Sequence, residues 1–405
     1  MRLLYVASLD FYTKPNPSFH LMTTMLEDVL DAGIEVKLIG CKEQGIKKHI
    51  PDEIKNKKGF TYDLIPTPVV KKSNFVRRYM EGIKYSVQVG KRMKKCIHDY
   101  DVIFIQSSPT VLYTLYYARK YGKNKKIIYN VQDMFPGSSI ASGVMPQKWM
   151  QKVFYTLQKI AYRKADYITA ISEDMKIKLI EQGVSEEKIK VIVNWFDDQS
   201  VHKVEWGENR FVKKYQMSPD KFYVQYAGTM GYVFDYKIVL DVAEKLKDDD
   251  NIVFQMIGVG SQKATFVNEA KERKLSNIQF LPLEPQEMVS DVYSACSVCF
   301  IPLKRGIIGN SVPSKAGLLM ACKKPIITSV DEGTDYFDMI NRYAGIAVSN
   351  LAPDMVVQAI LQMKDDPNFC DTCGEVGYEY GHELYSRKNG MREYLRLFRE
   401  CSENN

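Results

Sequence analysis

The chain has 405 residues, of which 45% are hydrophobic and 26% charged, and its formal net charge is +7. This length favours two domains, and the composition is ordinary for a folded, soluble protein. No window approaches the roughly 18 apolar residues of a membrane-spanning helix. The first residues, MRLLYVASLD, lack the long apolar core and the cleavage site of a signal peptide. The sequence therefore argues against a spanning helix and predicts a cytoplasmic protein.

The N-terminal half alternates short β-rich runs with helical patterns. Strands are predicted at 3–8, 34–40, 101–108, 126–133, 166–172 and 188–195. Helices are predicted between them, for example at 18–32 and 146–164. This βαβ alternation is typical of a parallel sheet with helices on both faces.

After a polar stretch, 197–221, the alternation starts again. Strands are predicted at 222–228, 252–258, 277–281, 297–303, 325–330 and 345–349, and the chain beyond 352 is helical. We therefore predict an α/β chain with two Rossmann-like, doubly wound domains, 1–200 and 201–375, that face each other across a cleft. A helical tail, 376–405, follows and can cross back to the N-terminal domain. Ligands are expected beyond the carboxyl ends of the strands.

Two glycine loops follow strands in the C-terminal half. Gly228-Thr229-Met230-Gly231 ends the run FYVQYAG, and Gly258-Val259-Gly260 ends IVFQMIG. Each precedes a predicted helix and can present backbone N–H groups to a phosphate. Neither is a GxGxxG fingerprint or a P-loop, and a lone GxxG is more often a plain turn. Both interpretations remain open from the residues alone.

A third loop follows the strand that ends near Leu303. It contains Lys304 and Arg305, and Val312-Pro313-Ser314-Lys315 then opens an apolar helix. Proline suits a first helical turn, and Ser314 can cap the helix or donate a hydrogen bond. A lysine at this end is disfavoured by the helix dipole, which an anionic ligand would explain. Ligand binding is favoured over an accidental surface lysine.

In the N-terminal half, two polar residues follow strands. Asp133, in NVQDMFPGSS, either caps the next turn or is an acid/base or a sugar-hydroxyl ligand in the cleft. His20, in the TKPNPSFH segment, is a lone histidine near the start of a helix, and a structural role is favoured for it over a functional one.

A strongly basic stretch runs from Lys71 to Lys95 and contains Glu81 as its one acidic residue. Its apolar residues recur at helical spacing: Val76, Met80, Ile83 and Val87. The pattern predicts an amphipathic helix with a basic face. Such a helix is either simply solvated or contacts anionic lipid headgroups. Nucleic acid is disfavoured because no recognition motif accompanies the charge.

The eight cysteines include two Cys-x-x-Cys pairs, Cys296/Cys299 and Cys370/Cys373. Buried or incidental reduced thiols are favoured over a four-cysteine zinc site. The spacing of the first pair on a strand predicts that its thiols point to opposite faces.

Five segments, taken in order, carry a resemblance to a known family. They are RKADYITAISE (163–173), KVIVNWFD (190–197), YAGTMG, IGVG and VPSKAGLLMACKKPIIT. Together they resemble family-4 glycosyltransferases of the GT-B fold over nearly the whole chain. The NW-x-D form, the D-x-x-P of Asp133–Pro136 and the P-S-K helix opening resemble a bacterial subgroup similar to N-acetylfucosamine transferases. Those enzymes assemble O-antigen, capsule and exopolysaccharide.

The resemblance implies a retaining transfer of a sugar from a UDP-linked donor to a lipid-linked or saccharide acceptor. Donor-binding residues would be Gly228, Thr229, Gly231, Gly258, Gly260, Arg305, Pro313, Ser314 and Lys315. Asp133 and Lys315 would be catalytic, and His20 and Asp133 would lie on the acceptor side. No cofactor and no metal ion is expected. The basic stretch 71–95 would then bring the protein to the inner face of the plasma membrane.

The chain departs from the family pattern at two glutamates near the last motif. The corresponding positions are Asn310 and Leu318, which puts the contacts to the donor sugar ring in doubt. Two alternatives stay open: an epimerase similar to UDP-N-acetylglucosamine 2-epimerase, and a non-catalytic scaffold of a polysaccharide-assembly complex. Such an epimerase relies on paired carboxylates and histidine in the cleft, whereas this chain has five histidines, of which His20 alone lies in an evident loop after a strand.

Overall fold

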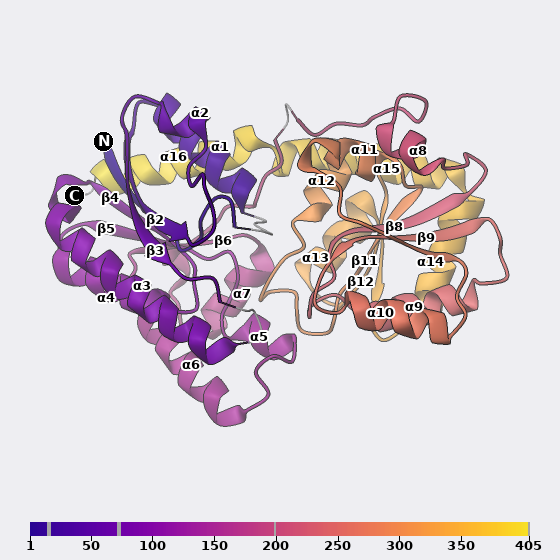
Figure 1. Cartoon of the computed structure of the whole chain (residues 1–405), viewed down its shortest axis with the longest axis horizontal. Coiled ribbons are helices and arrows are strands. Elements are labelled where there is room, and N and C mark those ends of the chain that lie inside the picture. The colour runs from indigo at the N-terminus through magenta and orange to yellow at the C-terminus, as the bar shows by residue number, and fades with distance from the viewer. Residues whose placement is uncertain (14–17, 71–73, 198–199, 404–405) are drawn as a thin grey trace. The chain divides into compact units, whose positions relative to one another are not determined.

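The structure is a computed structural model that describes residues 1–405 except 14–17, 71–73, 198–199 and 404–405. Contacts divide the chain into two compact units. Unit 1 comprises Met1–Gly137, Pro146–Asn194 and Arg387–Asn405. Unit 2 comprises Ser138–Met145 and Trp195–Ser386. Figure 1 shows a parallel sheet with flanking helices in each unit.

Unit 1 is built on a seven-stranded parallel sheet in the order β3-β2-β1-β4-β5-β6-β7. The strands are β1 (Arg2–Val6), β2 (Glu35–Glu43), β3 (Phe60–Thr67), β4 (Val102–Gln106), β5 (Lys126–Asn130), β6 (Tyr167–Ala170) and β7 (Ile189–Val191). Strand β3 was not among the predicted strands. Its burial is mostly partial because it is an edge strand, so it lacks the continuous apolar run of the central strands.

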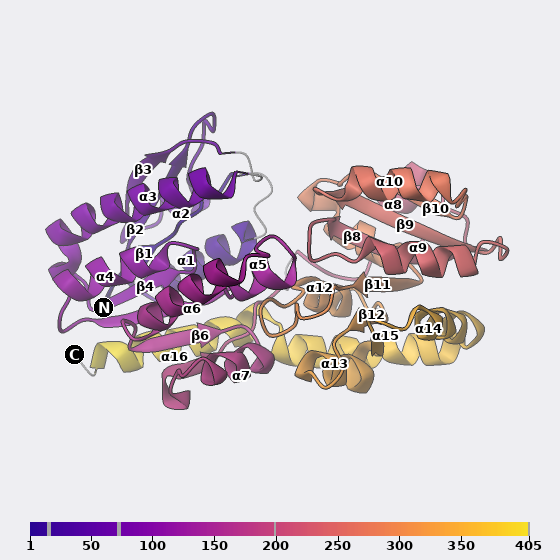
Figure 2. The same ribbon diagram turned by 90° about the horizontal axis from the view of Figure 1, so that it is seen from below.

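Helices cover both faces of this sheet. They are α1 (Phe19–Asp31), α2 (Asp52–Lys55), α3 (Phe75–Cys96), α4 (Val111–Tyr121), α6 (Lys148–Tyr162), α7 (Glu173–Glu181) and α16 (Arg387–Glu403). Figure 2 shows α3, α4 and α6 together on one face. Helix α16 joins the core of unit 1, where Asn130 Nδ2 donates to Tyr394 Oη at 2.6 Å and Phe398 packs on Phe104.

Unit 2 is built on a six-stranded parallel sheet in the order β10-β9-β8-β11-β12-β13. The strands are β8 (Phe222–Thr229), β9 (Ile252–Val259), β10 (Ile278–Leu281), β11 (Val298–Pro302), β12 (Ile326–Val330) and β13 (Gly345–Ser349). Its helices are α8 (Arg210–Tyr215), α9 (Tyr236–Lys245), α10 (Lys263–Glu272), α11 (Val289–Ser294), α12 (Lys315–Ala321), α13 (Asp335–Met339), α14 (Pro353–Asp365) and α15 (Pro367–Leu384). Helix α5 (Gly137–Ala141) begins at the last residue of the first segment of unit 1 and continues into unit 2.

Strand β11 shows how the sheet of unit 2 is buried on both faces. Val298 and Phe300 enter one hydrophobic cluster, while Cys299 and Ile301 enter the other. This alternation follows from the two-residue period of a strand. The predicted doubly wound α/β architecture of both halves is thus confirmed. The order of strands reverses at β1/β4 and at β8/β11, and these are the switch points where ligands bind in such sheets.

The prediction that Cys296 and Cys299 point to opposite faces is wrong. Strand β11 begins only at Val298, so Cys296 lies outside it, and both thiols enter the same cluster. Burial raises the pKa of Cys296 to about 11, which keeps this thiol protonated. Among the described residues no helix is long and apolar enough to cross a membrane.

Candidate functional site

The carboxyl ends of β8 and β9 meet at a pair of glycines. Gly228 pairs with Gly258 in parallel register, and their φ angles are +148° and +141°. A Cβ on Gly258 would lie 1.9 Å from the carbonyl oxygen of Gly228. Only glycine allows this backbone conformation at this separation. The glycines of these two loops therefore permit a close backbone approach, beyond simply turning the chain.

The loop after β8 is fastened to the loop after β9. Met230 N donates to Val259 O at 2.8 Å, and a Cβ on Gly260 would lie 2.2 Å from Met230 O. The Gln262 side chain donates to Gly231 O and, at 3.0 Å, to Phe234 O. Gly231 differs from the other glycines, because its φ is not positive and its Cβ would meet Thr229 at 3.6 Å. No steric requirement for glycine exists there.

Lys315, the first residue of α12, reaches the first of these loops. Its Nζ lies 3.7 Å from the centroid of the Tyr226 ring. A Cβ on Gly228 would lie 2.7 Å from the same Nζ, so the glycine leaves room for the ammonium group. The Tyr226 hydroxyl donates to Thr229 O at 2.9 Å. Across the described part of the chain, Lys315 has no acidic partner.

A second lysine lies at the same switch point. Lys304 follows β11, its backbone N donates to Val233 O at 3.0 Å, and its Nζ donates to Gln262 Oε1 at 3.4 Å. Burial raises the pKa of nearby Asp235, which accepts a hydrogen bond from Lys237 N at the start of α9. The loops after β8, β9 and β11 are thus brought together with two cationic side chains.

The loop between β11 and α12 is held by a hydrogen bond within it and by another to the residue after β12. Gly306 N donates to Asp331 Oδ2 at 2.7 Å, and Asn310 Nδ2 donates to Gly306 O at 2.9 Å. Asn310 is buried, and Leu318 packs against the core of unit 2. Both positions that depart from the family glutamates therefore support the loop and the helix.

The remaining residues predicted to bind the donor are more exposed and make fewer contacts. Arg305 and Ser314 are exposed, and Pro313 is half-buried. Ser314 has helical backbone angles and its side chain makes no capping hydrogen bond. Among the described residues, none of these three makes a hydrogen bond or an ion pair to the glycine loops.

Asp133 lies in unit 1, just beyond β5, and is exposed. Beside it is a polar network that sequence analysis missed. Gln132 Nε2 donates to Asn130 Oδ1 at 3.0 Å, and Asn194 Nδ2 donates to Gln132 Oε1 at 2.8 Å. The available signal was the polar residues at the ends of two predicted strands, 126–133 and 188–195.

His20 lies in the first turn of α1 and is half-buried. Residues 14–17 of the TKPNPSFH segment lie outside the described residues. A different histidine makes a close contact with a carboxylate: His49 Nδ1 lies 2.5 Å from Oδ2 of buried Asp10. Glu43 N also donates to Asp10, at 3.1 Å. This pair fastens the loop after β1 to the loop after β2, and its sequence separation hid it from motif analysis.

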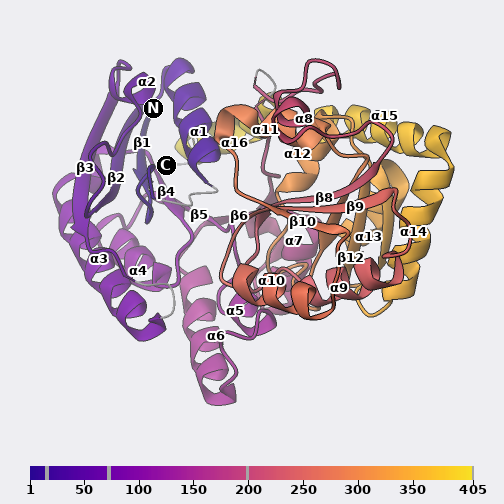
Figure 3. The same ribbon diagram turned by 45° about the vertical axis from the view of Figure 1, so that its right-hand side comes forward.

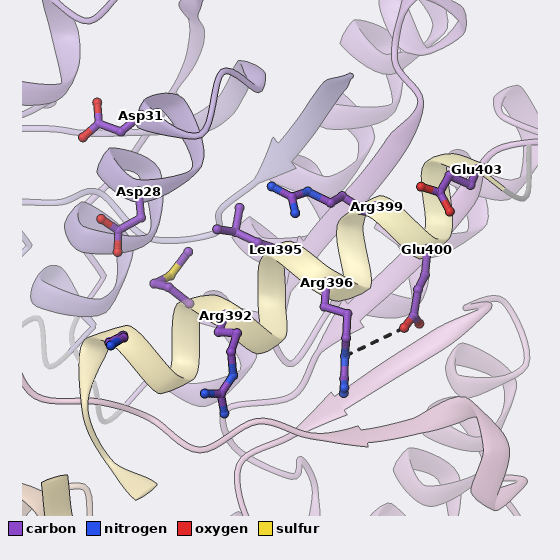
Figure 4. A pocket seen from close by; sticks show the side chains of 10 residues that line it. Asp28, Asp31, Arg392, Leu395, Arg396, Arg399, Glu400 and Glu403 are labelled. Atoms are coloured by element: carbon purple, nitrogen blue, oxygen red, sulfur yellow. Dashed lines mark ion pairs between the residues drawn. The ribbon is translucent and has the colours of Figure 1, made fainter. Parts of the chain in front are cut away.

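A groove of about 690 Å³ lies in unit 1 between α1 and α16. Figure 4 shows Arg392, Arg396 and Arg399 along α16, with an ion pair from Arg396 to Glu400. The groove contains none of the predicted site residues. No group of three or more His, Cys, Asp or Glu side chains in the described ranges is arranged to hold a metal ion.

Two family models match the chain. The model described as Glycosyltransferase Family 4 matches residues 22–200, and the one described as Glycosyl transferases group 1 matches residues 208–380. Together they cover most of the chain, which therefore belongs to the family-4 glycosyltransferases. The predicted family and fold class are confirmed, while the N-acetylfucosamine subgroup stays a prediction.

Two curated relatives are glycosyltransferases by name. The probable glycosyltransferase WbjE of Pseudomonas aeruginosa is 22% identical over 66% of this chain and 66% of its own length. The putative colanic acid biosynthesis glycosyl transferase WcaI of Escherichia coli is 24% identical over 59% of this chain and 58% of its own. The matches thus span less than two thirds of these relatives.

The fold has solved counterparts over the whole chain. Anabaena Alr3699/HepE, solved with UDP, superposes with a TM-score of 0.75 at 12% identity and covers 99% of this chain and 100% of its own. The same protein has also been solved with UDP-glucose. At this identity the likeness shows the fold.

Proposed function

We propose that this protein transfers a sugar, with retention of configuration, from a nucleotide diphosphate donor to a lipid-linked or saccharide acceptor. The proposal is carried by one observation: the Lys315 ammonium lies at the Gly228 end of β8, where Gly228 and the paired Gly258 leave no room for a side chain. A lysine without an acidic partner, beside glycine backbone that a ligand can approach closely, is a suitable binding site for the negative charge of a diphosphate. The UDP and UDP-glucose complexes of HepE support a UDP-linked donor, and the name of WcaI supports a role in bacterial surface polysaccharide assembly.

The chemistry follows from where charge develops. Cleavage of the glycosyl–phosphate bond leaves negative charge on the diphosphate. Lys315, Lys304 and backbone N–H groups of the glycine loops are preorganised to stabilise that charge, which is commonly the largest contribution to catalysis. Attack from the same face, with the leaving phosphate accepting the acceptor proton, accounts for retention without an enzymic nucleophile. Asp133 would orient the acceptor.

The same cations make a divalent metal unnecessary in this proposal. Transfer should therefore continue at an unchanged rate after treatment with EDTA and gel filtration. Loss of activity that Mg²⁺ restores would overturn metal independence and leave the donor proposal intact.

The acceptor is proposed to lie at the cytoplasmic face of the plasma membrane. The predicted amphipathic helix exists as α3, whose described cations are Arg77, Arg78, Lys84, Lys91, Arg92, Lys94 and Lys95. Lys71 and Lys72 lie outside the described residues. A basic helix of this kind is attracted to anionic headgroups.

A panel of nucleotide diphosphate sugars tests the donor by thermal denaturation. A true donor binds only the folded state and stabilises it by roughly 2.7 kcal/mol at a hundredfold excess over Kd. Transfer of radiolabelled sugar from that donor to membrane lipid extract should follow. Formation of an epimer without acceptor would favour the epimerase, and no stabilisation by any donor would refute the proposal.

A further inference from the structure

Helix α6 carries an apolar stripe on its exposed side. Trp149, Val153 and Ile160 are spaced i, i+4 and i+11 and therefore share one helical face. Trp149 is 68% exposed and Val153 is 48% exposed. The buried residues of α6 are on another face and include Gln158, Ala161 and Tyr162. An exposed tryptophan at the head of such a stripe is unusual for a helix that only covers a sheet.

A basic stripe runs beside the apolar one. Its lysines have the same spacing, one position earlier: Lys148, Lys152 and Lys159. All three are exposed, and none has an acidic partner within the described ranges. The helix contains no Asp or Glu. The exposed side of α6 is thus apolar along one edge and positively charged along the other.

Helix α3 repeats the arrangement in its first half. Val76 is 70% exposed and Met80 is 50% exposed, and they share a face with Ile83 and Val87. The residues of α3 that face the core lie mainly in its second half, from Tyr85 to Met93. The apolar stripe predicted from the sequence therefore does not lie in the core at its N-terminal end.

The two helices are joined by a cluster of aromatic rings. Phe154 of α6 packs on Phe75 and Tyr79 of α3, with ring centroids 6.0 and 5.2 Å apart, and on Phe135 at 5.1 Å. Both helices cover the same face of the seven-stranded sheet (Figure 2), and α6 projects beyond the strands (Figure 3). The exposed apolar residues of α6 and α3 therefore lie on two helices that are packed together through this aromatic cluster.

We propose that α6 is a membrane anchor, which inserts Trp149 and Val153 among the acyl chains of an anionic bilayer while Lys148, Lys152 and Lys159 contact the headgroups. Helices that lie in a membrane interface have the same two sides: an apolar side that includes tryptophan and a polar side rich in lysine. The charge favours a bilayer over a protein partner, because neither helix offers acidic residues for a mixed interface beyond Glu81. This inference deepens the proposed function, since it rests on an acceptor at the membrane.

The test uses the full-length protein and vesicles of phosphatidylcholine with or without phosphatidylglycerol. Trp149 is the exposed tryptophan of the chain, whereas Trp195 is buried and Trp206 is half-buried. Its fluorescence should shift to the blue with anionic vesicles and be quenched by brominated acyl chains. Trp149→Phe should remove most of that quenching. High salt should weaken binding, because it screens the headgroup attraction.

Co-sedimentation of variants separates insertion from charge. Val153→Ser should lower the vesicle partition coefficient about tenfold, the effect of withdrawing one aliphatic side chain from an apolar phase. Lys148→Gln/Lys152→Gln should reduce the preference for anionic vesicles, of which Lys159 and the cations of α3 should retain a part. Ile177→Ser on α7, where Ile177 is 52% exposed, is the matched control and should change nothing.

Equal binding by the Val153 variant and the control, or absence of quenching, would overturn the anchor. Binding of a second copy through this face without vesicle binding would overturn it as well. Neither donor nor acceptor is present in these measurements. Failure of donor binding in the thermal assay would therefore refute the proposed function without affecting the anchor.

Discussion

The ammonium group of Lys315 and the ring of Tyr226 form a cation–π contact, with 3.7 Å from Nζ to the ring centroid. The contact holds the charge above Gly228, where a methyl group would approach within 2.7 Å of it. The tyrosine is fixed in turn, since its hydroxyl donates to Thr229 O at the end of the same strand. The cation is thus positioned before any ligand arrives, which is the condition for electrostatic stabilisation without reorganisation.

Replacement of Lys315 by Met should lower kcat/KM for sugar transfer about 10²- to 10³-fold, the effect of removing one preorganised donor from a developing anion. The fold should be retained, because the methionine can keep the apolar contact with the Tyr226 ring. Steady-state kinetics with the identified donor checks this. Lys324→Met, beyond the C-terminal end of α12, is the control, and equal losses in both variants would contradict a specific role for Lys315.

Tyr226 should act as a positioning residue for Lys315. Tyr226→Leu removes the ring and should weaken donor binding about 3- to 30-fold, since cation–π contacts contribute about 0.5–2 kcal/mol. Tyr226→Phe keeps the ring, loses only the bond to Thr229 O, and should bind the donor nearly as well. Donor Kd from calorimetry distinguishes the two. An equal loss in both variants would assign the effect to the hydroxyl instead.

The sequence predicted the doubly wound sheets because their central strands are continuous apolar runs bounded by glycine and polar residues. It missed β3, whose edge position leaves it half-exposed. In the candidate site, the sequence pattern alone placed Gly228 and Gly258 at strand ends, and each is the next-to-last residue of its strand. The contact between Lys315 and Tyr226 joins residues far apart in the sequence, as does that between His49 and Asp10. Such pairs depend on the packing of neighbouring strands and loops, which no local pattern encodes.

Substitution of glycine should separate structural from permissive positions in the glycine loops. Gly258→Ala places a Cβ 1.9 Å from Gly228 O at a positive φ and should destabilise unit 2 by more than about 2 kcal/mol. Gly231→Ala meets its nearest atom at 3.6 Å and should change the stability by less than about 0.5 kcal/mol. Urea denaturation followed by circular dichroism measures both. A destabilised Gly231 variant would show that this glycine needs its conformational freedom.

Acid should weaken unit 2 through Asp291. Burial alone would raise the pKa of this carboxyl group, but hydrogen bonds from the Arg210 side chain and backbone outweigh it and hold the pKa below its ordinary value. A depressed pKa in the folded state stabilises the protein above the unfolded pKa, about 3.9. That contribution is lost as the pH falls through the folded pKa. The denaturation midpoint of the native protein should therefore decrease once the pH is below about 4. Asp291→Asn should lower the midpoint at neutral pH and make it depend less on pH in the acid range. An unchanged acid limb in the variant would contradict the assignment.

Asp133→Asn should reduce turnover far more than it reduces donor binding. Asp133 belongs to unit 1, at the carboxyl edge of its sheet, whereas the glycine loops and Lys315 belong to unit 2. Loss of an orienting carboxylate should lower kcat about 10²-fold, while the donor Kd from the thermal assay stays constant. Asp99→Asn is the matched control, because Asp99 is also exposed but precedes β4 at the amino edge of the same sheet. Small and equal effects on kcat and on donor Kd would instead identify Asp133 as a cap of the turn before α5.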